Sequence, residues 1–254
     1  MRLFNPGQSG PARRRYNRNV GGIQRFDVVY LLDVDNTLLD NDAVEQDLKR
    51  HIGEAFGTEC EERYLAIFEQ RRATLGYADY LGALQSYRIE HPREPHLIQI
   101  SLFLVDYPFQ DRLYPGALDV VGRLRHQGMT VILSDGDVVF QPLKVARSGL
   151  LNAVEGHALI YVHKEQMLDD VERRYPARHY VMFDDKLRIL AAMKAVWGPR
   201  LTTVFVRQGH YAHDPSILSA YPAADFTIDS IGDLAHADLP TWLGAAGARE
   251  RMEP

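Results

Sequence analysis

The chain has 254 residues, of which 46% are hydrophobic and 25% charged, and its formal net charge is −5. This length and composition suit a globular protein with a substantial core, built as one large domain or as a domain with a smaller companion. The negative charge argues against general nucleic-acid binding, and no apolar run reaches the length of a membrane span. The single cysteine, Cys60, excludes an internal disulfide. We therefore expect a cytoplasmic protein with no nucleic-acid or membrane partner.

The two ends of the chain are predicted to be tails. Residues 1–22 carry five arginines and no acidic residue, with several glycines and prolines. They lack the apolar centre of a secretory signal. We expect a disordered basic tail over 1–22 and a second tail over 246–254, although a basic docking arm is the alternative for the first segment.

Continuous apolar runs recur along the chain and predict strands that are covered on both faces, as in a parallel sheet. Amphipathic helical patterns lie between them. The predicted strands are 27–34, 129–134, 179–184, 201–206 and 225–228, and the predicted helices are 116–128, 164–175 and 186–197. This alternation predicts an α/β fold with a doubly wound, Rossmann-like parallel sheet.

Residues 42–111 break the alternation of strands and helices. They are charged and helical in period, and the more apolar stretch 96–109 is also best interpreted as a helix. We therefore predict an α/β core over 23–41 and 112–245, with 42–111 as a helical insertion between its first and second strands.

Polar side chains gather where three of the predicted strands end. The first strand ends at Asp33 and Asp35, and Lys164 begins a predicted helix. In an open parallel sheet, ligands bind beyond the carboxyl ends of the strands. Carboxylates collected there beside a lysine and a hydroxyl would bind a divalent cation next to an anionic group such as phosphate. The other polar strand ends are Ser134-Asp135 and Asp184-Asp185.

These motifs resemble those of the haloacid dehalogenase superfamily, most of whose members are magnesium-dependent phosphatases. "LLDVDNTLL" matches the D-x-D-x-T motif, "VILSDGD" the serine motif and "VMFDDK" the late acidic pair, with the motif lysine placed at Lys164. All four occur in order over roughly residues 25–235, which is far more specific than one motif alone. Two positions depart from the usual pattern: Asn36 stands where glycine is common, and Lys186 where a small residue is common.

The resemblance implies a phosphatase acting through an aspartyl-phosphate. Asp33 would attack phosphorus. Asp35 would protonate the leaving alcohol and later activate water. Lys164 would neutralise charge on Asp33 and on the phosphate. The substrate would be a small phosphorylated metabolite.

The resemblance also implies which residues bind phosphate and Mg²⁺. Ser134 and the amide of Asp135 would hold phosphate oxygens, and Thr37 would fix the loop. Asp184 and Asp185 would anchor Mg²⁺, together with Asp33 and the main-chain carbonyl of Asp35.

Other charged residues lie outside the four motifs. Lys144 is a rival for the motif lysine, but its place within a helical pattern predicts a solvated side chain. In the family, an insertion after the first motif is a cap that closes over the site, and residues 42–111 match it in position. Its arginines, Arg72 among them, are candidates to contact an anionic substrate, although a solvated helix face is the simpler interpretation. His210 and His213 are candidates to reach the rim of the site, although hydrogen-bonded loop histidines are the simpler interpretation.

Two other functions stay open at this stage. A phosphomutase would retain all four motifs. A non-catalytic phospho-acceptor module would use similar groups, but it would be shorter, without an insertion, and with its acidic pair earlier in the chain. The sequence does not identify the substrate or the oligomeric state.

Overall fold

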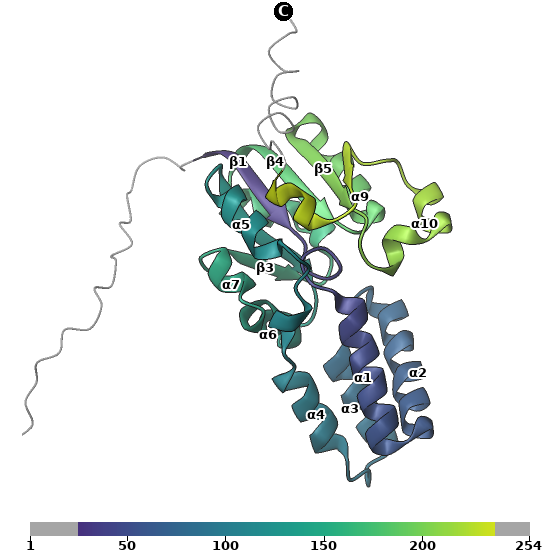
Figure 1. Cartoon of the computed structure of the whole chain (residues 1–254). Helices are drawn as coiled ribbons and strands as arrows, with labels where there is room; N and C mark the ends of the chain where they lie inside the picture. Colours follow the sequence, from purple (N-terminus) through teal and green to yellow (C-terminus); the bar gives the residue numbers. More distant parts are fainter. Residues whose placement is uncertain (1–24, 237–254) are drawn as a thin grey trace, which may run out of the picture.

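The computed structural model describes residues 25–236 and has a six-stranded parallel sheet at its centre, in the order β3-β2-β1-β4-β5-β6 (Figure 1). This confirms the predicted α/β class with a doubly wound parallel sheet. Both predicted tails, 1–22 and 246–254, lie outside the described residues. The strands are β1 (Phe26–Leu32), β2 (Met129–Asp135), β3 (Ala158–Tyr161), β4 (Ala177–Asp184), β5 (Leu201–Val206) and β6 (Phe226–Ile228).

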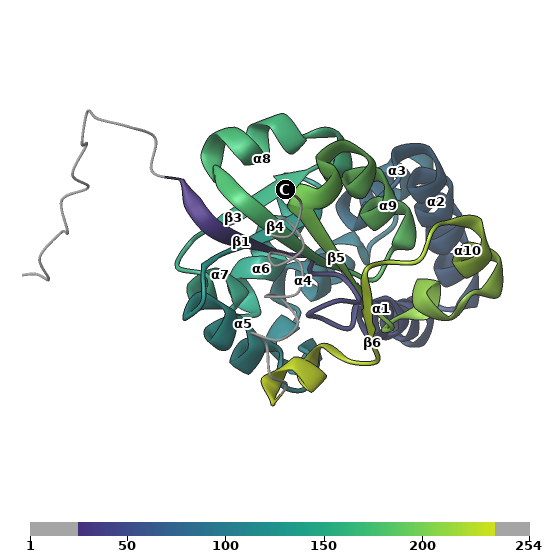
Figure 2. The same ribbon diagram turned by 90° about the horizontal axis from the view of Figure 1, so that it is seen from above.

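Helices cover both faces of the sheet. Alternate residues of a strand point to opposite faces, so β1 contributes to two apolar clusters. Tyr30 and Leu32 of β1 belong to one apolar cluster, whereas Val29 and Leu31 belong to another. Figure 2 shows the sheet between these helical layers. The first face is covered by α5 (Ala117–Arg125), α6 (Phe140–Arg147) and α7 (Leu150–Ala153), and the second by α8 (Leu168–Arg174) and α9 (Leu187–Trp197).

The segment between β2 and β4 differs from its prediction in two ways. The edge strand β3 was not predicted, although the short apolar run 158–162 marks it in the sequence; of its four residues only Leu159 is buried. The single helix predicted over 164–175 is instead a 3₁₀ helix, η2 (Lys164–Gln166), followed by α8. The first turn is separate because the Asp135 carboxylate accepts a hydrogen bond from the Lys164 amide at 2.7 Å, which ties this turn to the end of β2.

Between β1 and α5, four α-helices form the helical insertion. They are α1 (Asn41–Phe56), α2 (Thr58–Leu75), α3 (Tyr80–Glu90) and α4 (Leu97–Asp106). Asp40 and Asp79 accept hydrogen bonds from backbone amides at the starts of α1 and α3, and the left-handed Gly76 follows α2. Figure 1 shows the four helices projecting from the α/β part, beyond the end of β1.

The insertion packs on the α/β part through aromatic and polar contacts. The Phe140 ring of α6 lies 5.1 Å from Tyr80 and 5.5 Å from Phe109, between ring centroids. Asp47 of α1 accepts hydrogen bonds from the Tyr107 hydroxyl and the Arg112 guanidinium, close to where the chain returns to the α/β part. The apolar core therefore continues from the first face of the sheet into the insertion.

The remaining elements are short: η1 (Phe109–Arg112), η3 (Gly198–Arg200), η4 (His210–His213), α10 (Pro215–Ala220) and η5 (Ile231–Ala235). In the part of the chain that the structure describes, no helix combines the length and the apolar character needed to span a membrane.

Candidate active site

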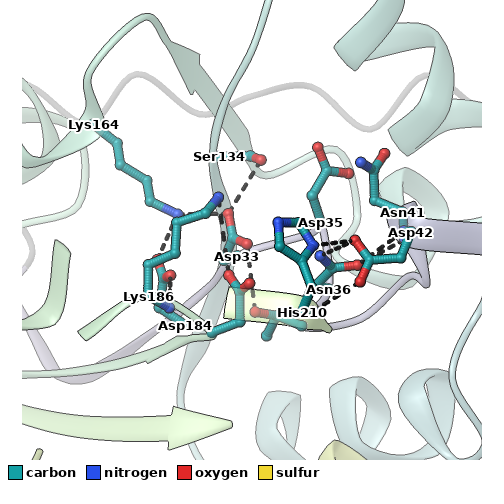
Figure 3. A network of polar contacts seen from close by, with 12 residues as sticks. Asp33, Asp35, Asn36, Asn41, Asp42, Ser134, Lys164, Asp184, Lys186 and His210 are labelled. Carbon is teal, nitrogen blue, oxygen red and sulfur yellow. Dashed lines mark hydrogen bonds and ion pairs between the residues drawn. The ribbon is translucent and has the colours of Figure 1, made fainter. Parts of the chain in front are cut away.

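Asp33 lies directly after β1, at the centre of the sheet, and its side chain is almost completely buried. Its backbone amide donates a 3.0 Å hydrogen bond to the carbonyl of Phe183 on the neighbouring strand β4, which fixes the main chain. The hydroxyl of Ser134 lies 3.3 Å from Asp33 Oδ1, and that of Thr37 lies 3.4 Å from Oδ2. Figure 3 shows Ser134, Lys164 and Asp184 grouped around this carboxylate.

Lys164 neutralises two of the carboxylates at this edge of the sheet. Its Nζ lies 2.5 Å from Asp33 Oδ1 and 2.7 Å from Asp184 Oδ2, and the side chain is 1% exposed. Burial acts to lower the pKa of Lys164, but Asp184 and Asp33 outweigh it, so the pKa is raised above its ordinary value. The structure thus brings together Lys164 and Asp33, as the sequence analysis expected.

The two late aspartates complete a buried acidic group. Ligand oxygens of Asp33, Asp184 and Asp185 all lie within 4.8 Å of one another. Within residues 25–236, neither carboxylate oxygen of Asp185 receives a hydrogen bond, and Lys186 Nζ remains 4.0 Å from Oδ1. Burial raises the pKa of both Asp184 and Asp185. A hard cation such as Mg²⁺ prefers oxygen ligands of this kind, so the donor set fits that ion.

Asp35 lies apart from this group because a second lysine holds its carboxylate. Lys144 Nζ is 2.6 Å from Asp35 Oδ1 and 2.8 Å from Asn41 Oδ1, and Gln141 Nε2 is 3.4 Å from Asp35 Oδ2. In Figure 3 the Asp35 carboxylate lies beside Asn41, away from the Asp33–Lys164 contact. The prediction of a solvated Lys144 is wrong, since this side chain is fully buried against an aspartate from a distant part of the chain.

The loop after Asp35 turns through Asn36, whose φ of +60° explains how asparagine replaces the usual glycine. Its side-chain oxygen accepts from the amides of Asn41 and Asp42, and its amide donates to Asp42 Oδ1 at 2.9 Å. Asp42 also accepts from the His210 amide at 2.8 Å and lies 2.7 Å from the His210 ring. His210 is therefore a hydrogen-bonded loop residue, and it also lines the cavity above Asp33.

The Asp135 carboxylate accepts the hydrogen bond from the Lys164 amide and so fixes the start of η2. Burial raises the pKa of Asp135 to about 6. Thr37 contacts the Asp33 carboxylate, and its carbonyl accepts a 3.4 Å hydrogen bond from Gln208 Nε2, which anchors the loop from the other side.

A small cavity of about 60 Å³ lies over these residues. A much larger groove, of about 750 Å³, lies along α2 and the end of α3 and contains none of the residues grouped around Asp33. Arg72 and Tyr77 belong to the insertion, and both line the small cavity. Its other lining residues are Asp33, Asp35, Asn36, Asn41, Gly76, Ala78, Ser134, Asp135, Lys186, His210 and Tyr211.

Several polar residues of the site were missed by the sequence analysis. Asn41, Asp42 and Gln141 occur in segments that predict only helix starts or helix faces. One signal was available for Gln141 and Lys144, because they are three residues apart and therefore share one side of the helix after the Ser134 motif.

Comparison with known proteins supports a single family. A model of haloacid dehalogenase-like hydrolases matches residues 29–196. A haloacid dehalogenase-like hydrolase from Burkholderia xenovorans LB400 is 63% identical, with a TM-score of 0.81, over 84% of this chain and 99% of that one. The search of curated proteins found no match.

Two more distant structures are similar to the chain in fold. YfnB of Bacillus subtilis, in a magnesium-bound form that shows interdomain movement, is 18% identical with a TM-score of 0.54, over 84% of this chain and 98% of that one. The L-2-haloacid dehalogenase of Xanthobacter autotrophicus is 18% identical with a TM-score of 0.54, over 82% of this chain and 96% of that one.

Proposed function

The chain belongs to the haloacid dehalogenase-like hydrolases, and from that premise we propose that it is a Mg²⁺-dependent phosphatase of a small phosphorylated metabolite. The observation that carries the proposal is the Asp185 carboxylate, buried beside Asp33 and Asp184 with no hydrogen bond from any described residue. A cation there would compensate the negative charge. The magnesium-bound YfnB structure supports this choice of ion, because the same fold holds magnesium there.

The first step would be attack by Asp33 on phosphorus. Its carboxylate forms a new O–P bond as the bond from phosphorus to the leaving alcohol oxygen breaks. Lys164 and Ser134 already contact Asp33 Oδ1, so they hold the nucleophile in place. Bound Mg²⁺ would supply positive charge that reduces the repulsion between Asp33 and the phosphate dianion.

Asp35 would transfer the protons. It donates one to the leaving alcohol oxygen, and afterwards takes one from the water that hydrolyses the aspartyl-phosphate. Asp35 lines the same cavity as Asp33. Hydrolytic dehalogenases lack an acid at this position, so Asp35 favours phosphoryl transfer over carbon–halogen cleavage.

The helical insertion would act as the cap. A cavity of about 60 Å³ is small beside the roughly 300–1,000 Å³ of a ligand pocket, so we expect the insertion to move when a substrate enters. Closure would exclude water from the site and select a small leaving group. Arg72 and Tyr77 are the insertion residues placed to contact that group.

The test is phosphate release from a panel of phosphorylated metabolites and one generic aryl phosphate, with Mg²⁺ or a chelator. Asp33→Asn should lower turnover by about 1,000-fold or more. Asp27→Asn is the matched control, because it changes an exposed aspartate at the opposite end of the same strand. Release of halide from 2-haloacids without any phosphatase activity would overturn the proposal, as would full activity in chelator.

A further inference from the structure

Lys144 is a fully buried cation that the proposed chemistry does not use. It lies on α6 with its ammonium 2.6 Å from Asp35 Oδ1 and 2.8 Å from Asn41 Oδ1. Its Nζ is also 5.6 Å from the centre of the Phe140 ring. Burying an ammonium is costly unless it is paired and hydrogen-bonded, so a lysine in this place is not explained by packing alone.

The contacts of Lys144 distinguish the two oxygens of Asp35. Oδ1 accepts a short hydrogen bond from the ammonium, whereas the one hydrogen bond that Oδ2 accepts from residues 25–236 is the 3.4 Å contact with Gln141 Nε2. Lys144 can donate to Oδ1 whether or not Oδ2 carries a proton. Oδ2 is consequently the oxygen that remains available to exchange a proton with a molecule in the cavity.

Lys144 is also connected to the helical insertion through buried polar groups. Asn41, at the start of α1, accepts from Lys144 and donates to the Tyr80 hydroxyl of α3 at 3.2 Å. The Tyr80 ring packs on Phe140, one turn before Lys144 on the same helix. The position of the ammonium therefore depends on how the insertion sits against α6.

We propose that Lys144 is a positioning residue: it holds Asp35 Oδ1 so that Oδ2 faces the leaving group, and Asn41 and Tyr80 make this arrangement depend on the seated insertion. This inference rests on the proposed phosphatase function. It assigns a role to a residue outside the four sequence motifs, and the role is carried out through Asp35 without contact with substrate.

Esters whose leaving alcohols differ in acidity provide the test, because a simple loss of packing would slow all of them equally. An alkyl alcohol needs a proton as its bond to phosphorus breaks, whereas an acidic phenol leaves readily without one. Lys144→Met should therefore lower kcat/KM for an alkyl phosphate by about 100-fold, but for an activated aryl phosphate by only a few-fold. Lys194→Met is the matched control, since Lys194 pairs with Asp225 and the Leu201 carbonyl at the amino ends of β5 and β6, away from the site.

A double mutant tests whether the effect passes through Asp35. On an Asp35→Asn background, Lys144→Met should produce little further loss, because the group that it positions is already absent. This pair also removes both charges, which avoids leaving one buried alone. If Lys144→Met alone does not fold, Lys144→Gln replaces it, with a donor retained and the charge lost. Equal losses for both esters, or full additivity in the double mutant, would overturn the inference.

A structural measurement separates this inference from the proposed function. In a crystal structure of Lys144→Met, the Asp35 carboxylate should leave its place beside Asn41, and an unchanged carboxylate would overturn the positioning role. If the wild-type protein hydrolyses no phosphate ester, the proposed function is wrong, and the crystal structure still decides whether Lys144 positions Asp35.

Discussion

Replacing Asp185 by asparagine should stabilise the protein in the absence of Mg²⁺. The Asp185 carboxylate is buried, receives no hydrogen bond from residues 25–236, and lies 4.0 Å from the nearest ammonium, that of Lys186. A buried polar group without a partner costs about 1–3 kcal/mol, and a charged one costs more. The asparagine amide avoids only the charged part of this cost, so we expect a gain of about 1 kcal/mol in the free energy of unfolding. For a protein of this size the Tm should rise by roughly 2–4 °C.

The same substitution should remove the response to Mg²⁺. A ligand that binds only the folded protein stabilises it by about 2.7 kcal/mol at a concentration 100 times its Kd. The wild-type Tm should then rise by roughly 5–10 °C when Mg²⁺ replaces a chelator. Asp185→Asn loses an oxygen ligand with its negative charge, and its Tm should change little.

Thermal unfolding followed by circular dichroism, in chelator and in Mg²⁺, measures both effects without any substrate. Asp27→Asn, an exposed change on β1, should behave as the wild type does under both conditions. If Asp185→Asn melts below the wild type in chelator, the carboxylate is not the unfavourable group inferred here. If the variant gains as much from Mg²⁺ as the wild type, Asp185 is not a ligand.

Three further outcomes are expected. Lys164→Met should lower kcat by at least about 100-fold, because the nucleophile loses its buried counter-charge, and phosphate release measures the loss. Arg72→Ala should change KM or the order of preferred substrates in the metabolite panel while leaving the Mg²⁺ requirement intact; an unchanged order would exclude Arg72 from substrate contact. Asp47→Asn should lower stability by about 1 kcal/mol at neutral pH. Burial opposes ionisation of Asp47, but hydrogen bonds from Tyr107 and Arg112 outweigh it and lower its pKa below the ordinary 3.8. This contribution is present above that value and is lost as pH falls through the lowered pKa, so the Tm curves of variant and wild type should converge in acid.

The sequence by itself determined most of the sheet and most of the polar residues that gather at the carboxyl ends of its strands. Apolar runs that end on Asp33, Ser134 and Asp184 predicted both the strands and their common edge, because parallel strands all end on the same side of a sheet. The motif spacing also predicted that Lys164 lies beside Asp33, and the structure places it there.

Weak local signals account for what the sequence analysis missed in the fold. The edge strand β3 is four residues long and mostly half-buried, and the short apolar run 158–162 is the local signal that marks it. The break between η2 and α8 depends on the hydrogen bond from the Lys164 amide to Asp135, a residue 29 positions earlier, and helical periodicity carries no record of it.

Only the tertiary structure decided what surrounds Asp35. The pattern around Lys144 predicted a helix, and α6 is one, but the pattern did not predict that this lysine is buried. Its partner Asp35 lies 109 positions away, and Asn41 lies 103 positions away in the first turn of the insertion. Periodicity reports which side of a helix is apolar, because that depends on neighbours within a few turns. Whether a charged side chain on that helix faces water or a buried carboxylate depends on which distant segment packs against it, and that is settled only when the insertion and the sheet come together.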